Sequence, residues 1–192
     1  MSVPRHGLDS TRVVGEALRI ADADGLGEVT LARVAAALDV RAPSLYNHVD
    51  GRDGLLRALA LRSLSELTDV LRDAAVGRAR EDAMRAIAYA YRDYARRHPG
   101  GYAAIQRAPA AGDGELAAAA GRLLDVILAV LSGWGLEGDR AVHHIRVIRS
   151  ALHGFVTLEA EGGFGLPLDL DQSFELLVAT LGAGLEPNAD AG

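Results

Sequence analysis

The sequence of 192 residues contains no cysteine and no lysine, and only 5% of its residues are aromatic. The absence of cysteine excludes disulfides, thiol nucleophiles and cysteine-ligated zinc. The longest apolar run, Leu123–Leu131, is interrupted by Asp125 and is too short to cross a bilayer, and the N-terminus carries no apolar signal segment. We therefore expect a soluble cytoplasmic protein without membrane association.

Sequence patterns that mark enzymes are also missing. There is no Gly-x-Ser-x-Gly, no His-Glu-x-x-His, no phosphate loop and no dinucleotide fingerprint. His143 and His144 are neighbours, about 100° apart on a helix, so they do not share a metal as an i, i+4 pair does. Asp169 and Asp171 precede a predicted helix, where capping is the simpler role. We expect no enzymatic activity, no metal and no cofactor.

Apolar residues make up 49% of the chain and recur at helical spacing, with no strand alternation and no repeat. This pattern predicts an all-α protein of about nine helices. We expect Ser10 or Thr11 to cap the first helix, a long helix over 51–75, a short helix over 102–107, and final helices capped by Asp139 and Asp171. We also expect two domains, residues 1–55 and residues 56–192.

The most informative stretch is Val29–Leu56, which has the pattern of a helix-turn-helix. Its first helix carries Leu31, Val34, Ala35 and Leu38 on one face, with Thr30 as the N-cap. Asp39 tolerates the left-handed backbone of a tight turn. Pro43 suits the first position of a second helix, because its φ is fixed near the helical value and it lacks an N–H.

Only Leu45 and Val49 are apolar anchors in this second helix, so its small, aromatic and hydrogen-bonding residues face outward. Such a helix suits reading of the major groove, where bases present donors, acceptors and thymine methyl groups. The alternative interpretation is an ordinary surface helix with a half-buried tyrosine.

The same stretch, followed by Gly51, Arg52 and Asp53, resembles the DNA-binding domain of the TetR family of transcriptional regulators. The Pro43-Ser44-Leu45-Tyr46 segment is similar to that of the tetracycline repressors. The resemblance implies that Thr30 caps the first helix and touches the DNA backbone, and it places further DNA-binding residues at Arg41, Ala42, Pro43, Ser44, Tyr46, Asn47, His48 and Arg52. Among them Ala42, Pro43, Ser44 and Asn47 face bases, while Tyr46, His48 and Arg52 hold phosphates.

The net charge of the first sixty residues does not by itself favour DNA binding, because these residues include seven arginines and eight acidic residues. Local arrangement decides phosphate contacts more than this sum does, and Arg41, His48 and Arg52 lie inside the motif.

The closing two helices carry more apolar surface than one face needs, which favours a two-fold homodimer through a four-helix bundle. A dimer would place two reading helices on a palindromic DNA operator. The segment Leu152-His153-Gly154-Phe155 resembles the effector domain of a TetR subgroup, and Gly154 suits a close helix contact. The candidate residues for a small-molecule effector pocket are Tyr91, Tyr94, Tyr102, Gln106, Trp134, His144, His153 and Phe155.

We thus expect a ligand-responsive repressor of transcription that binds a palindromic operator as a homodimer. The alternative from another class is a helical small-molecule binding or carrier protein whose helix-turn-helix is not functional. The dependence of DNA affinity on salt separates the two.

Overall fold

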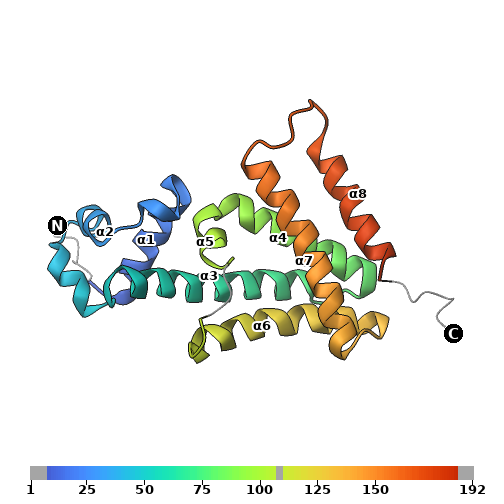
Figure 1. Ribbon diagram of the computed structural model, residues 1–192, viewed down its shortest axis with the longest axis horizontal. Helices are drawn as coiled ribbons and strands as arrows, with labels where there is room; N and C mark the ends of the chain where they lie inside the picture. The colour runs from blue at the N-terminus through green and yellow to red at the C-terminus, as the bar shows by residue number, and fades with distance from the viewer. Residues whose placement is uncertain (1–7, 107–109, 186–192) are drawn as a thin grey trace, which may run out of the picture. The chain divides into compact units, whose positions relative to one another are not determined.

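The chain is almost entirely helical in the computed structural model, which describes residues 8–106 and 110–185 (Figure 1). Over these residues no strand occurs, and eight α-helices and one six-residue 3-10 helix make up the nine expected helices. They are α1 (Ser10–Asp24), α2 (Leu31–Ala37), the 3-10 helix η2 (Ala42–Asn47), α3 (Gly51–Ala75), α4 (Arg80–Arg97), α5 (Pro99–Ala104), α6 (Gly114–Leu131), α7 (Gly138–Ala160) and α8 (Leu170–Ala183). Two shorter 3-10 turns are η1 (Leu26–Glu28) and η3 (Ser132–Trp134). The all-α prediction is confirmed.

Contacts divide the chain into two compact units, each built from two separate stretches of sequence. The first unit comprises residues 1–65 and 97–119, and the second comprises residues 66–96 and 120–192. Each of the predicted domains, 1–55 and 56–192, is instead one continuous stretch of sequence. That division stays a prediction.

The core of the first unit is formed by α1, α2, η2 and the start of α3. Seven of its apolar side chains have no exposed surface: Val13, Ala17, Val29, Val34, Leu45, Leu55 and Leu59. Leu31 and Leu38, at the ends of the predicted apolar stripe, are partly buried against this cluster. Burial of each large aliphatic side chain contributes about 2 kcal/mol, so this core holds the helix-turn-helix in one geometry.

The short helix α5 completes the first unit by packing on α1. The carboxylate of Asp22 accepts hydrogen bonds from the backbone amides of Gly100 (2.8 Å) and Gly101 (3.1 Å). A Cβ atom at Gly100 would lie 2.2 Å from the backbone carbon of Ala21. The helix was expected to begin at residue 102, which is wrong. It begins at Pro99, because proline suits the first turn and Asp22 satisfies the amides that follow.

Two predicted N-caps lie too late in the sequence. Asp9 caps α1, in place of Ser10 or Thr11, and its carboxylate accepts from an amide in the first turn at 2.8 Å. Asp169 caps α8 and accepts from the amide of Asp171 at 2.8 Å. In both cases a carboxylate reaches an otherwise unpaired amide of the first turn, which stabilises the helix by about 1 kcal/mol. The helix α7 likewise begins one residue before its predicted cap.

The second unit contains a buried ion-pair network that joins α4, α7 and α8. The guanidinium of Arg92 donates to Glu159 at 2.6 and 2.9 Å and to Asp171 at 2.7 Å. It also lies 5.4 Å from the ring centre of Phe155 and 4.7 Å from that of Phe174. The hydrogen bonds that Glu159 accepts from Arg92 lower the pKa of Glu159, and the same bonds raise the pKa of Arg92. One charged residue therefore connects three helices.

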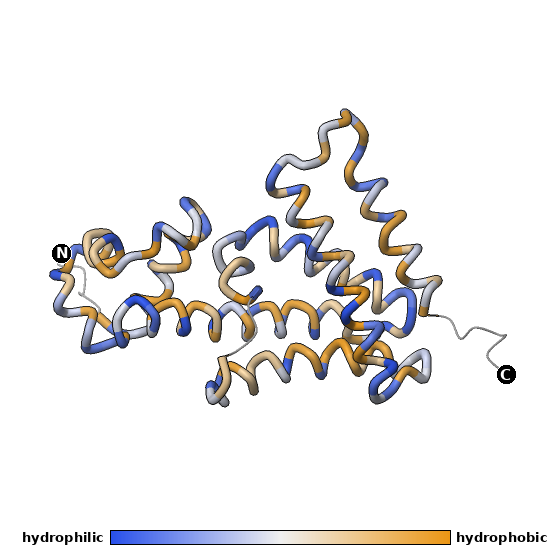
Figure 2. Tube along the Cα trace, viewed as in Figure 1, coloured by the Kyte–Doolittle hydropathy of each residue, from blue (hydrophilic) through white to orange (hydrophobic). Residues whose placement is uncertain are grey.

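The helix α6 is the most apolar of the described helices, and orange and pale orange predominate along it in Figure 2. Within Gly114–Trp134 an 18-residue window reaches a mean hydropathy of 1.7, and by length and composition alone this helix is long and apolar enough to cross a membrane. Only 17% of that window is buried. The run Leu123–Leu131, expected to be too short to cross a bilayer, is the central part of this longer segment, and length and composition alone do not assign the segment to a membrane.

Candidate DNA-binding site

The helix α2 and the turn after it form as the sequence pattern predicts. The hydroxyl of Thr30 accepts from the amide of Arg33 at 3.2 Å and so caps α2. Val34 and Ala35 are buried on its inner face. Asp39 has a φ of 55°, in the left-handed region expected for the turn. The turn therefore redirects the chain from α2 to the next helix without a glycine.

The expected reading helix is the 3-10 helix η2, not an α-helix. Pro43 occupies its first turn, Leu45 has no exposed surface, and Val49, just beyond the helix, is 8% exposed. The two anchors hold one side of this short segment against the core of the first unit. The opposite side is open, and the ring of Tyr46 is 63% exposed.

The structure brings the nine predicted DNA-binding residues together on α2, η2 and the start of α3. Six of them are exposed: Thr30, Arg41, Pro43, Tyr46, Asn47 and Arg52. The other three, Ala42, Ser44 and His48, are half-buried. The residues thus share the open surface of one compact segment, although their contacts with DNA stay a prediction.

The arginines near this surface differ in what they bind. Arg33 pairs with Asp24 and with Glu28, so its charge is balanced by acids that precede the motif. Arg52 donates from Nε to the carbonyl of Val29 at 2.9 Å, which ties the start of α3 to the residue before Thr30, the N-cap of α2. Arg41 forms no ion pair with any carboxylate of the described residues. Arg41 is consequently the clearest free cation beside η2.

Sequence reasoning missed two supports of this surface. The carbonyl of His48 accepts from the hydroxyl of Ser10 at 3.4 Å, which links η2 to the start of α1. The second support is the Arg52 bond to Val29, since Arg52 was expected only to hold phosphate. Neither partner is close in sequence, so no local pattern marks them.

The eight predicted effector residues are divided between the two units. Tyr102 and Gln106 belong to the first unit, and the other six belong to the second. Buried side chains are Tyr94, Tyr102, Trp134 and Phe155, while Tyr91, Gln106, His144 and His153 are half-buried. The two cavities described in the second unit are lined by other residues. The effector pocket therefore stays a prediction.

Comparison with known proteins decides the family. The family model for the tetracyclin repressor-like C-terminal domain matches residues 84–181. The uncharacterized HTH-type transcriptional regulator Rv0681 of Mycobacterium tuberculosis is 39% identical over 96% of this chain and 85% of its own length. The chain belongs to the TetR family of transcriptional regulators. YobS of Bacillus subtilis, another uncharacterized HTH-type regulator, is 35% identical over 95% of both chains.

Solved structures agree with this TetR assignment at the level of the fold. A protein of unknown function from Rhodococcus sp. RHA1 has a TM-score of 0.81 and 22% identity, with 97% and 100% of the two chains covered. A possible TetR family transcriptional regulator from Streptomyces coelicolor A3(2) has a TM-score of 0.70 and 22% identity, with 92% and 98% covered. As a TetR-family regulator the chain is a DNA-binding protein and not an enzyme.

Proposed function

We propose that this TetR-family regulator is a cytoplasmic, homodimeric repressor that binds a palindromic operator and is released by a small-molecule effector. In this proposal residues 1–55 bind DNA, and residues 56–192 bind the effector and form the dimer. The observation that carries it is the open surface of η2, which is anchored by Leu45 and exposes Tyr46. A short helix of this kind contacts only a few base pairs, so two copies about one helical turn apart are needed to specify an operator.

Base and phosphate contacts divide as the family resemblance implies. Asn47 and Pro43 are exposed on η2, where they would meet base edges together with the half-buried Ala42 and Ser44. Tyr46, His48 and Arg52 would hold phosphates and fix the register of η2 in the groove.

Salt dependence of operator binding tests this proposal against the carrier alternative. An operator is first selected from a genomic or random DNA pool, and its affinity is then measured between 50 and 200 mM salt. We expect affinity to fall steeply with salt, and Arg41→Ala to reduce the slope of log K against log salt by about one. Arg122→Ala, which makes the same charge change on α6, should leave the slope unchanged. A shallow slope, or no enriched sequence from a well-folded dimer, would favour the carrier protein.

The dimer is supported by apolar side chains that α7 and α8 leave uncovered in a single chain. Val147 is 60% exposed and Leu158 is 46% exposed on α7, and Leu176 is 70% exposed on α8. A Cβ added at Gly154 would meet nothing within 4 Å. Glycine in a helix costs about 1 kcal/mol relative to alanine, and close approach of a second protomer would offset that cost.

Glutamate on this surface should dissociate the dimer. We expect Val147→Glu and Leu176→Glu each to weaken self-association by about 100-fold, because an unpaired carboxylate buried in an interface costs about 3 kcal/mol. Sedimentation velocity over a range of concentrations measures the change. Val76→Glu, at a 68% exposed position between α3 and α4, is the control. Dimers of wild-type stability in both variants would contradict the proposed interface.

Effector release requires only that the ligand prefer a state in which the two reading helices no longer match the operator. A preference of about 1–3 kcal/mol is enough to change operator affinity several-fold. A structure of a TetR variant from Acinetobacter baumannii AYE in complex with minocycline, 23% identical to this chain, is an example of a small molecule bound to a protein of this fold. The aromatic and histidine side chains named above are our candidates for the corresponding role here.

A further inference from the structure

A groove in the second unit combines an apolar floor with a rim of arginines. It is formed by the end of α3, the connector 76–79, the start of α4 and the end of α6, and its volume is about 510 Å³. Cavities of roughly 300–1,000 Å³ accept small organic ligands. We call it the arginine groove, after Arg72, Arg78 and Arg80 on its rim. None of the eight effector candidates lines it.

The floor of the arginine groove consists mainly of small apolar side chains. Ala75, Ala79 and Ala83 contribute from α3, the connector and α4, and Val126 and Ala129 contribute from α6. The alanine side chains are single methyl groups, which are too small to fill the space between these helices. They therefore leave an open apolar floor in the groove. Such a surface accepts a flexible alkyl chain, because burial of each CH₂ group contributes about 0.8 kcal/mol.

One wall of the groove is held in a strained arrangement. Arg80 has a φ of 49°, in the left-handed region, and its guanidinium lies 5.7 Å from the ring centre of Trp134. A Cβ at Gly133 would lie 3.3 Å from Cγ of Arg80, so glycine at this position leaves room for the arginine. Backbone strain of this kind costs about 1–3 kcal/mol, and its clustering at ligand sites is a general observation.

The three arginines of the rim are not equally available to a ligand. Arg72 pairs with Asp69 at 2.8 Å, and Arg80 lies 3.8 Å from Glu81. Arg78 donates to the carbonyl of Ala74 at 2.8 Å. Among the described residues no carboxylate forms an ion pair with Arg78. The positive charge of Arg78 is thus uncompensated at the edge of the apolar channel.

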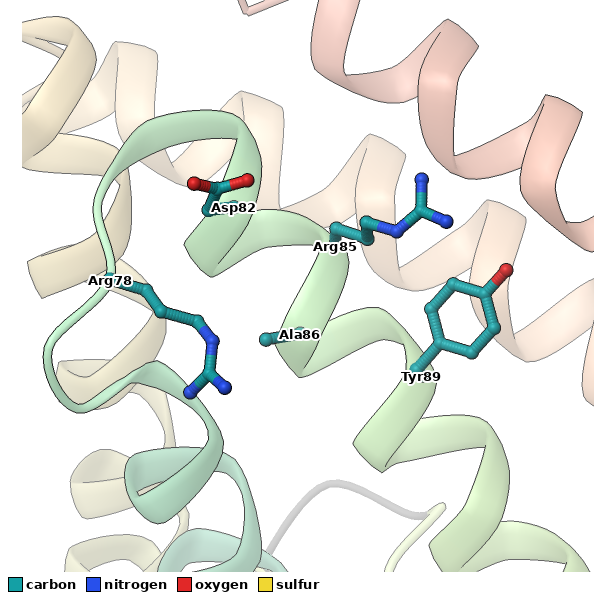
Figure 3. A pocket seen from close by; sticks show the side chains of 5 residues that line it. All are labelled: Arg78, Asp82, Arg85, Ala86 and Tyr89. Carbon is teal, nitrogen blue, oxygen red and sulfur yellow. The ribbon is translucent and has the colours of Figure 1, made fainter.

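Arg78 also lines a second cavity of about 340 Å³, together with Asp82, Arg85, Ala86 and Tyr89. Figure 3 shows the guanidinium of Arg78 directed away from that of Arg85. Arg85 pairs with Glu175, and the hydroxyl of Tyr89 donates to the same carboxylate at 2.5 Å. An anion at this end of the unit would therefore bind Arg78 first.

We propose that the arginine groove binds an amphipathic carboxylate, with its headgroup on Arg78 and its alkyl chain along the alanine floor. A guanidinium offers a carboxylate two parallel hydrogen bonds, which favours this headgroup over a neutral alcohol or a cation. Asp125, also on the groove lining, would repel an anionic headgroup placed beside it in place of Arg78. The charges of Arg78 and Asp125 thus set the orientation of the bound carboxylate in the groove.

Binding can be followed at Trp134, the only tryptophan of the sequence, which adjoins Gly133 of the groove. We expect a saturable change of its fluorescence on titration with decanoate below the micelle concentration, with matching heat in calorimetry. Decanol and decyltrimethylammonium should bind at least tenfold more weakly, because they cannot form the charge-assisted pair. The absence of both signals with decanoate, or equal binding of decyltrimethylammonium, would overturn the proposal.

Variants of the intact protein locate the site. Arg78→Gln should weaken decanoate binding about tenfold or more, and Ala129→Leu should weaken it by filling the floor without a change of charge. Arg122→Gln, on α6 outside the groove lining, is the matched control for charge. Unchanged binding in Arg78→Gln would overturn the assignment.

The inference deepens the proposed function, because it names a ligand class for the proposed effector-binding domain. Binding of the carboxylate does not depend on the proposed function. Only a change of operator affinity on binding rests on it. Binding of decanoate that leaves operator affinity unchanged would count against the groove as an effector site, and the binding site itself would stand. If the protein binds no operator in any assay, that result would contradict the proposed repressor function but not the carboxylate site.

Discussion

Replacing Gly100 with alanine should destabilise the protein by about 3 kcal/mol and weaken operator binding. The new methyl group would lie 2.2 Å from the backbone of Ala21, and backbone atoms cannot yield as a flexible side chain does. The helices α1 and α5 would have to separate, which would also lengthen the hydrogen bonds from the first turn of α5 to Asp22. The gain of about 1 kcal/mol that alanine normally brings to a helix is too small to compensate.

Urea unfolding and operator titration measure the two effects of Gly100→Ala. Gly121→Ala is the matched control, because a Cβ at Gly121 in α6 would meet nothing within 4 Å. This control should be neutral or more stable by about 1 kcal/mol. An unfolding midpoint of Gly100→Ala equal to that of the wild type would show that the contact between α1 and α5 is looser than described.

The second large effect is expected from Glu159→Gln. The side chain of Arg92 is only 5% exposed, and its guanidinium would lose the carboxylate that accepts two of its hydrogen bonds. Removing one partner of a buried pair leaves an uncompensated charge, which costs about 3–5 kcal/mol. Because Asp171 is 74% exposed, it cannot replace the lost partner within the buried part of the network.

Thermal or urea unfolding tests this effect, with Glu161→Gln as the control at an exposed position two residues further on. The double variant Arg92→Met with Glu159→Gln should recover much of the lost stability, since it removes the buried charge itself. A single variant as stable as the wild type would mean that water reaches Arg92 in the folded protein.

The pH dependence of unfolding should reveal the same pair. The pKa of Glu159 is lowered in the folded state, chiefly by its hydrogen bonds to Arg92. Its contribution to stability is therefore complete above the unfolded pKa, about 4.3, and is lost as pH falls through the lower folded value. Glu159→Gln should lack this component, so the difference in stability between wild type and variant should shrink in acid.

The local elements of the candidate DNA-binding surface could be predicted from sequence because their determinants are local. Thr30, Asp39 and Pro43 each act on backbone within three residues, and Leu45 and Val49 mark the buried side by their spacing. The kind of helix was not predictable in the same way. The two anchors are compatible with either helical form, and the structure has the 3-10 form over Ala42–Asn47.

The features that sequence reasoning missed depend on partners far along the chain. Pro99 and Gly100 have the composition of a helix breaker, and only Asp22, more than seventy residues earlier, makes them a helix start. Arg92 stands four residues after the buried Ala88, at a position of the inward stripe of α4. This spacing places Arg92 on the buried face of α4 and was the available signal. An arginine is nevertheless expected at the surface unless an acidic partner is known, and the sequence does not show that Glu159 lies beside it.

The contact between α1 and α5 also bears on how the protein is made. The first unit needs residues 97–119, so its helix-turn-helix cannot acquire its full set of contacts while those residues are still inside the ribosome. A nascent chain that ends after the long helix α3 has its reading segment but leaves Asp22 without the amides of Gly100 and Gly101. Most of the chain must therefore be synthesised before the first unit is complete, and a recombination that joins its helix-turn-helix to another domain has to include α5.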